Sequence, residues 1–161
     1  VRIPVIVYNV PGRTGLDIPV SVYKSISKIP NIAGVKEAST DIAKIARIRN
    51  ACGPDFPVWC GNDDQIVPVT ALGGQGVISV LSNVLPKETA ALCEAALDGD
   101  FDTAADLQCR YLPLIEALFS EVNPIPVKAA MKEIGYDCGC CRLPLCQISN
   151  ENFIKLKNAI K

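Results

Sequence analysis

The amino-acid sequence predicts an α/β fold: half of a TIM (β/α)8 barrel, made of strands five to eight, followed by a C-terminal helical domain. Short apolar, β-branched runs alternate four times with segments of helical pattern, which is typical of parallel strands joined by helices. Only helical patterns follow the fourth run. A complete barrel needs eight strands and about 250 residues, whereas the chain has 161 residues. Residues 1–85 are assigned to the half barrel and residues 86–161 to the helical domain.

The predicted strands are near-continuous apolar runs, as expected for parallel strands that are covered on both faces. They lie at residues 5–8, 32–36, 58–60 and 77–80. An open, doubly wound sheet of four strands is the alternative arrangement. It is disfavoured because no Gly-x-Gly-x-x-Gly fingerprint, which marks nucleotide binding in that fold, follows the first strand.

Helical patterns fill the segments between the strands and the chain beyond them. The expected helices lie at residues 19–29, 41–51, 64–72, 86–97, 101–119, 123–135 and from 149 onward. Thr40, Asp63 and Ser149 stand at positions where a side chain can cap the following helix. Pro113 predicts a kink in the longest helix because a proline inside a helix removes a backbone hydrogen bond.

Composition and charge exclude several classes of function. Sixteen basic and seventeen acidic residues give a net charge of −1 without a basic run, so nucleic acid and membrane surfaces are not expected partners. The apolar runs are too short to span a bilayer, and no signal peptide is recognisable. We therefore expect a cytoplasmic protein. The sequence has no histidine, which excludes Ser-His-Asp and Cys-His catalysis. The chain starts without Met and almost directly in a strand, which suggests a fragment.

Lys36 ends the second predicted strand, at the edge of the sheet where barrel enzymes build their active sites. Burial disfavours a charged ammonium and so lowers the pKa of a lysine. A neutral amine can attack a carbonyl group and form a Schiff base. The alternative is an ordinary lysine that extends from the strand end into solvent.

Tyr8 and Arg13 are the other candidates at this edge. Tyr8 ends the first strand, and parallel neighbours lie about 4.8 Å apart, so its phenol could reach the lysine and transfer protons. Arg13 follows in the loop 12–15, where a guanidinium suits a carboxylate. The alternatives are a locally packed tyrosine and a solvated arginine.

Glycine-rich and cysteine-rich segments give weaker signals. Gly61 follows the third strand and so lies on the functional face, whereas the segment 73–76 precedes a strand and lies on the opposite face. The sequence has eight cysteines, four of them clustered at Cys138, Cys140, Cys141 and Cys146. Their spacing differs from that of common zinc sites, so we expect mostly reduced, unpaired thiols and no bound metal. An oxidised pair and a metal held by this cluster are the alternatives.

Five segments, in matching order and spacing, closely resemble the dihydrodipicolinate synthase family, also called the 4-hydroxy-tetrahydrodipicolinate synthases. They are YNVPGRTG at 8–15, GVKEAS at 34–39, GNDD at 61–64, GVISV at 76–80 and NPIPVK at 123–128. The resemblance corresponds to the second half of the family's barrel and its helical C-terminal domain. It implies a lyase of the class I aldolase type that condenses pyruvate with L-aspartate 4-semialdehyde in diaminopimelate and lysine biosynthesis, without metal or organic cofactor.

The resemblance also assigns roles to residues. It implies that Lys36 forms a Schiff base with pyruvate and that Tyr8 relays protons. It implies that Arg13 binds a substrate carboxylate and that the backbone at Ile78 lines the pyruvate pocket, and we add Gly61 to the substrate-binding set. The family also uses a Thr-Thr pair and a second tyrosine from the first half of the barrel. Because this chain lacks that half, we expect it to be inactive alone.

The family implies a homo-oligomer, commonly a tetramer, and the chain could instead pair with a missing N-terminal half. A sister pyruvate aldolase, of the N-acetylneuraminate lyase or keto-deoxy sugar acid type, shares the lysine and tyrosine but generally lacks the equivalent of Arg13. A non-catalytic half-barrel module is the third possibility.

Overall fold

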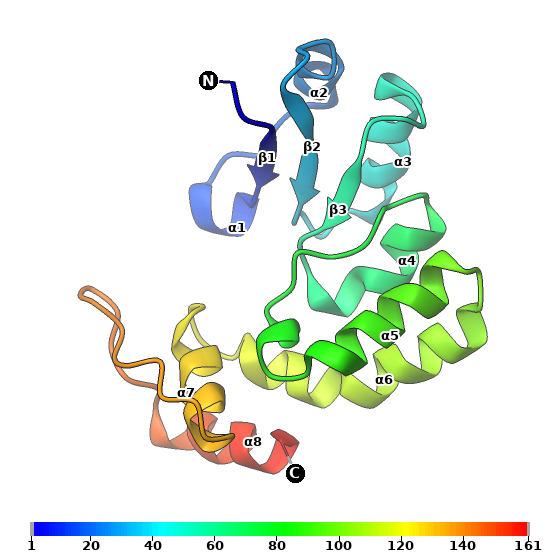
Figure 1. Cartoon of the computed structure of the whole chain (residues 1–161). Helices are drawn as coiled ribbons and strands as arrows, with labels where there is room; N and C mark the ends of the chain where they lie inside the picture. The colour runs from blue at the N-terminus through cyan, green and yellow to red at the C-terminus, as the bar shows by residue number, and fades with distance from the viewer. Residues whose placement is uncertain (1, 161) are drawn as a thin grey trace.

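The computed structural model describes residues 2–160, and its centre is a parallel sheet with the order β1-β2-β3. These strands are β1 (Val5–Asn9), β2 (Ile32–Glu37) and β3 (Val58–Cys60), which confirms the first three predicted strands. Tyr8 pairs with Lys36 across β1 and β2. The parallel order places the carboxyl ends of the three strands at one edge of the sheet (Figure 1).

The predicted fourth strand at residues 77–80 is wrong. The structure has only a single parallel bridge there, between Cys60 and Val77. The Ile78 N–H still donates to the Cys60 carbonyl at 2.9 Å. Beyond this bond, the Asp63 carboxylate accepts the backbone N–H groups of Val80 and Leu81, each at 2.9 Å. The chain then turns into the 3-10 helix η2 (Leu81–Asn83). The segment lies beside β3, as expected, but is too short to form a strand.

Three helices cover one face of the sheet (Figure 1): α2 (Val20–Ile26), α3 (Ile42–Cys52) and α4 (Ile66–Ala71). They correspond to the predicted helices: α2 and α4 are shorter than predicted, and α3 is shifted by one residue. Their apolar side chains pack on the sheet in one core of buried residues, which comprises Tyr23, Val35, Ile45, Ile48, Phe56, Val58, Cys60 and Val69. Three short elements were not predicted, namely α1 (Pro11–Thr14) and the 3-10 helices η1 (Asp63–Gln65) and η2.

The C-terminal part is helical, as predicted. It contains α5 (Pro86–Leu97), α6 (Phe101–Leu118), α7 (Ile125–Glu133) and α8 (Asn150–Ile160). Buried residues of α4, α5 and α6 share a second core, and α6, α7 and α8 enclose a third around Leu118 and Leu156. The domain division after residue 85 stays a prediction, since packing is continuous across it. Within residues 2–160, no helix is both long and apolar enough to cross a membrane.

Two of the three predicted helix caps are wrong. Asp41, not Thr40, precedes α3, and its carboxylate forms an ion pair with Arg47 instead of capping the helix. Asp63 lies inside η1 and binds backbone N–H groups of a distant segment instead of its own helix. Ser149 caps α8 as expected, since its hydroxyl accepts the Asn152 N–H at 3.4 Å. Pro113 lies inside α6, and the kink expected there stays a prediction.

Candidate active site

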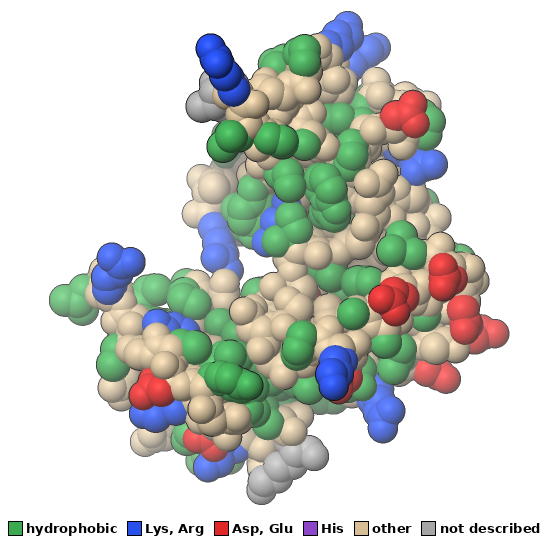
Figure 2. Space-filling model, in the orientation of Figure 1, with side chains coloured by type: hydrophobic (Ala, Val, Ile, Leu, Met, Phe, Trp, Pro, Cys, Tyr) green, Lys and Arg blue, Asp and Glu red, His purple; other side chains and the backbone are tan. Residues whose placement is uncertain are grey.

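The second face of the sheet carries the side chains that could take part in a reaction. Side chains alternate between the two faces along a strand. Val35 is fully buried against the helices, so the neighbouring Lys36 points to the opposite face. The register places Tyr8 and Trp59 beside Lys36 on that face. In the orientation of Figure 1, hydrophobic and basic side chains lie side by side over this region (Figure 2).

Lys36 and Tyr8 are in direct contact, as the sequence predicts. The Lys36 Nζ lies 4.3 Å from the centre of the Tyr8 ring. This geometry is a cation–π contact when the amine is charged. The Tyr8 side chain is 44% exposed, so its phenol remains accessible to solvent and to a ligand that approaches Lys36. The pair therefore places an amine beside a phenol.

The burial of Lys36 shifts its amine toward the neutral form. Burial lowers the pKa of Lys36, and the nearby positive charge of Arg13 lowers it further, whereas Asp63 and Cys60 act in the opposite direction. Burial is the largest of these causes. Because a lysine attacks carbonyl groups only in its neutral form, the lowered pKa increases the reactive fraction at neutral pH.

Arg13 lies in the single-turn helix α1 rather than in the loop that the sequence predicts. Val10 precedes the turn, and its carbonyl accepts the Arg13 N–H at 2.9 Å. Gly15 ends the turn with φ of 68°, a conformation that glycine adopts without strain. The Arg13 side chain is exposed, yet its charge acts on Lys36. Its guanidinium is thus available to an anion near the amine.

Gly61 and Ile78 border the same region. The Gly61 N–H donates to the Glu37 carbonyl at 2.7 Å, and a Cβ at this position would lie 2.5 Å from the Ala38 Cβ. Only glycine lets the chain after β3 approach β2 so closely. Ile78 is 37% exposed, next to the bridge residue Val77. The structure therefore brings all five predicted site residues to the carboxyl-end side of the sheet.

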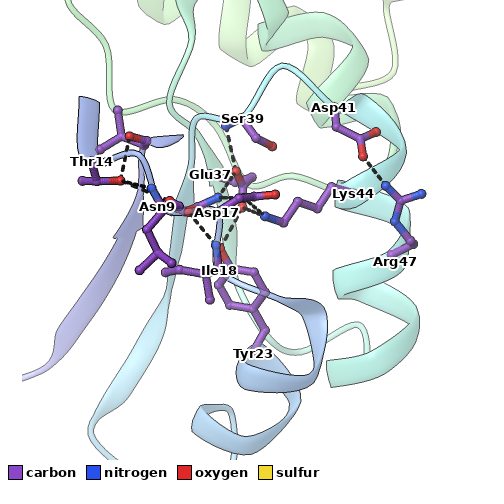
Figure 3. A network of polar contacts seen from close by, with 12 residues as sticks. Asn9, Thr14, Asp17, Ile18, Tyr23, Glu37, Ser39, Asp41, Lys44 and Arg47 are labelled. Atoms are coloured by element: carbon purple, nitrogen blue, oxygen red, sulfur yellow. Dashed lines mark hydrogen bonds and ion pairs between the residues drawn. The ribbon is translucent and has the colours of Figure 1, made fainter. Parts of the chain in front are cut away.

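A buried polar network behind the site was not predicted (Figure 3). Glu37 accepts hydrogen bonds from the Tyr23 hydroxyl at 2.8 Å and the Asn9 amide at 2.8 Å. Lys44 lies 3.7 Å from Glu37 and forms an ion pair with Asp17. The only sequence signal was that Asn9 and Glu37 directly follow Tyr8 and Lys36, so they occupy paired positions on the opposite face of the sheet.

The charges of this network shift the pKa values of two members. Burial, and then the charge of Glu37, raise the pKa of Tyr23. The hydrogen bond from Lys44, and then that from Asn9, lower the pKa of Asp17. Tyr23 is therefore kept protonated and Asp17 ionised. Both states match the hydrogen bonds, in which the phenol donates and the carboxylates accept.

The cysteines form no recognisable centre. All eight are free thiols, including Cys138, Cys140, Cys141 and Cys146. In the part of the chain that the structure describes, no group of three or more Cys, Asp or Glu side chains could hold a metal ion. Cys60 is the thiol closest to the site in sequence, and burial raises its pKa to about 12. It is therefore a neutral core residue and a poor nucleophile.

Comparisons with known proteins identify the relatives of this chain. A family model described as the dihydrodipicolinate synthetase family matches residues 2–161. A protein of Caldicellulosiruptor saccharolyticus, named 4-hydroxy-tetrahydrodipicolinate synthase, is 52% identical over 99% of this chain and 54% of its own length. A protein of the same name from Acetivibrio thermocellus is 48% identical over 100% of this chain and 54% of its own length. The chain thus spans about half the length of the curated relatives it matches.

Solved structures give the same result. Dihydrodipicolinate synthase from Aquifex aeolicus superposes with a TM-score of 0.95 at 41% identity, over 99% of this chain and 55% of that one. The enzyme from Acinetobacter baumannii, solved in complex with pyruvate, has a TM-score of 0.94 at 37% identity, over 99% of this chain and 55% of that one. The fold is therefore the α/β fold of these enzymes, in a part consistent with a partial barrel.

Proposed function

The chain belongs to the dihydrodipicolinate synthetase family, and from this premise we propose that it carries the catalytic lysine of a pyruvate-dependent lyase. The lyase is of the class I aldolase type, and its product is 4-hydroxy-tetrahydrodipicolinate, a precursor of diaminopimelate and lysine. The observation that carries the proposal is the Lys36–Tyr8 contact, in which the Nζ of a lysine with a lowered pKa lies 4.3 Å from a tyrosine ring.

The proposed reaction begins at the Lys36 amine. Its lone pair attacks the keto carbon of pyruvate, and the resulting carbinolamine loses water to form an imine. Loss of a methyl proton gives an enamine, whose carbon forms a new bond to the aldehyde carbon of L-aspartate 4-semialdehyde. The amino group of that substrate then attacks the imine carbon, closes the ring and displaces Lys36 as the free amine. No metal or organic cofactor takes part.

Tyr8 is assigned the proton transfers at these steps. The chain has no histidine, so a phenol is a suitable group for moving protons between the carbinolamine and water. The direct contact with Lys36 supports this role, because a proton-transferring group must lie within reach of the reacting atoms.

Arg13, Ile78 and Gly61 are assigned to substrate binding. The exposed guanidinium of Arg13 suits the carboxylate of the aldehyde substrate, which would approach the enamine from solvent. The backbone at Ile78 and Gly61 borders the region where pyruvate would lie. One related structure was solved in complex with pyruvate, and we propose the same ligand for this chain.

The proposal extends to the assembly. Ile6 and Tyr8 are each 44% exposed on the sheet face that no described helix covers. An apolar sheet face of this kind needs a cover, either the first half of the barrel or another copy of the chain. We therefore expect a homo-oligomer or pairing with an N-terminal half. We also expect a cytoplasmic location, and little turnover from the 161 residues alone.

Reductive trapping tests the proposal in the complete polypeptide, by which we mean the full-length protein that contains this chain. Pyruvate and sodium borohydride should convert the imine into a stable secondary amine, detected as a mass increase on the peptide that contains Lys36. The Lys36→Ala variant should show no increase, and the Lys87→Ala variant should react like the parent. Absence of an adduct, or an adduct that survives Lys36→Ala, would refute the proposed chemistry.

A comparison of acceptors tests the substrate. L-aspartate 4-semialdehyde should be turned over with pyruvate much faster than sugar-acid aldehydes, and Arg13→Ala should raise the KM for the semialdehyde. If a sugar-acid aldehyde is preferred while the pyruvate adduct still forms, the enzyme is a sister aldolase and only the substrate assignment fails.

A further inference from the structure

Asn9 occupies a buried position between the loop that carries Arg13 and the strand that carries Lys36. It follows Tyr8 in β1 but points to the other face of the sheet, and it is 1% exposed. Its backbone carbonyl accepts the Ala38 N–H at 2.9 Å, which joins the ends of β1 and β2. Its side chain therefore lies where it can contact both the loop that follows β1 and the end of β2.

The Asn9 amide uses all of its main hydrogen-bonding capacity. Its two N–H hydrogens have two carboxylate acceptors, Asp17 Oδ1 at 2.8 Å and Glu37 Oε1 at 2.8 Å. Its carbonyl oxygen accepts the Ile18 N–H at 3.1 Å. The two carboxylates fix the orientation of the amide, because a carboxylate can only accept. Among side chains of this size, only asparagine both donates twice and accepts at these positions.

Figure 3 shows the Asn9 side chain bound to Asp17 and Ile18. These bonds close the loop that contains Arg13. The segment leaves β1 at Asn9 and returns at Asp17 and Ile18, where the Asn9 side chain binds it. Inside the loop, the Thr14 hydroxyl bonds to the Leu16 N–H at 3.2 Å. Closing a loop at its ends removes most of the conformations that its backbone could adopt. The exposed Arg13 side chain is therefore presented from a backbone that is fixed at both ends.

Glu37 links the same amide to the strand of Lys36. It is 2% exposed, and the Oε1 atom that accepts from Asn9 also accepts the Ser39 N–H at 2.8 Å. The loop of Arg13 and the strand end of Lys36 thus share one buried carboxylate. If the loop moved away, the buried Oε1 atom would lose its Asn9 donor and keep only the Ser39 N–H, and losing a hydrogen bond is costly in a buried site.

We propose that Asn9 is a positioning residue of the active site, which sets the place of Arg13 relative to Lys36 through its bonds to Asp17, Ile18 and Glu37. It does not touch substrate. The role of Arg13 in binding the carboxylate of the aldehyde substrate rests on the proposed function, whereas the closure of the loop does not.

Two isosteric variants of the complete polypeptide test the proposal. Asn9→Asp replaces the donor amide with a carboxylate that faces Asp17 and Glu37. Asn152→Asp is the matched control, since Asn152 donates to the Glu121 carboxylate at 2.8 Å in the C-terminal helices. Cleavage by trypsin after Arg13, followed by mass spectrometry, should become at least about tenfold faster in Asn9→Asp, which corresponds to about 1.4 kcal/mol of lost loop stability. The control should be cleaved there at the parent rate.

Kinetics separate positioning from a general loss of structure. Asn9→Asp should raise the KM for L-aspartate 4-semialdehyde about tenfold, while the borohydride-trapped pyruvate adduct on Lys36 forms within about twofold of the parent rate. Combining it with Arg13→Ala should add no further rise in KM, because the second change removes the group that is positioned. Additive effects, or an unchanged KM, would overturn the proposal.

Two outcomes need separate readings. If the parent forms no adduct and no product, the proposed function fails. Trypsin cleavage of Asn9→Asp still tests the loop: cleavage faster than in the parent would support loop closure by Asn9, and an unchanged rate would overturn the positioning role. If Asn9→Asp does not fold, Asp17→Ala removes the exposed end of the same closure and should show the same increase in cleavage. An unchanged rate in that variant would overturn the proposal.

Discussion

Removing the Tyr23 hydroxyl should destabilise the protein without changing its shape. Tyr23 is fully buried, and its hydroxyl donates to Glu37 Oε2 at 2.8 Å. In Tyr23→Phe, that oxygen keeps only Lys44, at 3.7 Å. A hydrogen bond to a charged group contributes about 1.5–3 kcal/mol to the free energy of unfolding. For a protein of this size, that loss lowers the midpoint of thermal unfolding by about 3–12 °C.

The assay is thermal unfolding of the complete polypeptide, followed by circular dichroism. The matched control is Tyr136→Phe, which removes the same atom from a side chain that is 64% exposed and should leave the midpoint unchanged. An equal midpoint for Tyr23→Phe and the parent would refute the reasoning that the phenol stabilises the buried carboxylate.

The same pair predicts a pH dependence with a definite sign. Burial and Glu37 raise the pKa of Tyr23 in the folded state, whereas in the unfolded state it titrates near its ordinary value of about 10. Its contribution is therefore complete below about pH 10 and is lost as the pH rises above that value. The stability gap between the parent and Tyr23→Phe should narrow there by up to about 1.4 kcal/mol per pH unit. A gap that widens above pH 10 would contradict the assigned hydrogen bond.

Three further outcomes are expected. Because burial lowers the pKa of Lys36, competitive acetylation followed by peptide mass spectrometry should show its reactivity reaching a plateau at lower pH than that of a free lysine derivative in the same reaction. Because Asp63 raises the pKa of Lys36, Asp63→Asn should move that plateau to still lower pH, and a move to higher pH would contradict the assignment. Leu118→Ala should lower the free energy of unfolding in urea by about 2–5 kcal/mol, since Leu118 is fully buried, whereas Leu143→Ala, at a position 91% exposed, should not.

Local patterns predicted much of the fold. The first three strands and most helices follow from apolar runs and helical periodicity, which depend on neighbouring residues only. The backbone contacts of the fourth segment could not be judged in this way, because the Asp63 carboxylate that binds residue 80 lies far from it in the sequence. The cap predicted at Asp63 failed for the same reason, since its partners lie far along the chain.

The candidate site divides in a similar way. Tyr8 and Lys36 were predictable because parallel strands place their final residues side by side. The supporting network was not, because its members come from separate elements and resemble ordinary surface residues in sequence. Lys44 is the clearest case: in a helix it reads as solvent-exposed, yet its side chain is 4% exposed and faces Glu37. Only the folded arrangement of α2, α3 and the sheet identifies such residues.

A crystal structure of the complete polypeptide soaked with pyruvate tests the central claim most directly. We expect continuous density from the Lys36 Nζ to the keto carbon of pyruvate, with the Tyr8 hydroxyl next to the new bond. Pyruvate bound elsewhere, or a Lys36 amine that extends into solvent without a bound keto acid, would contradict it.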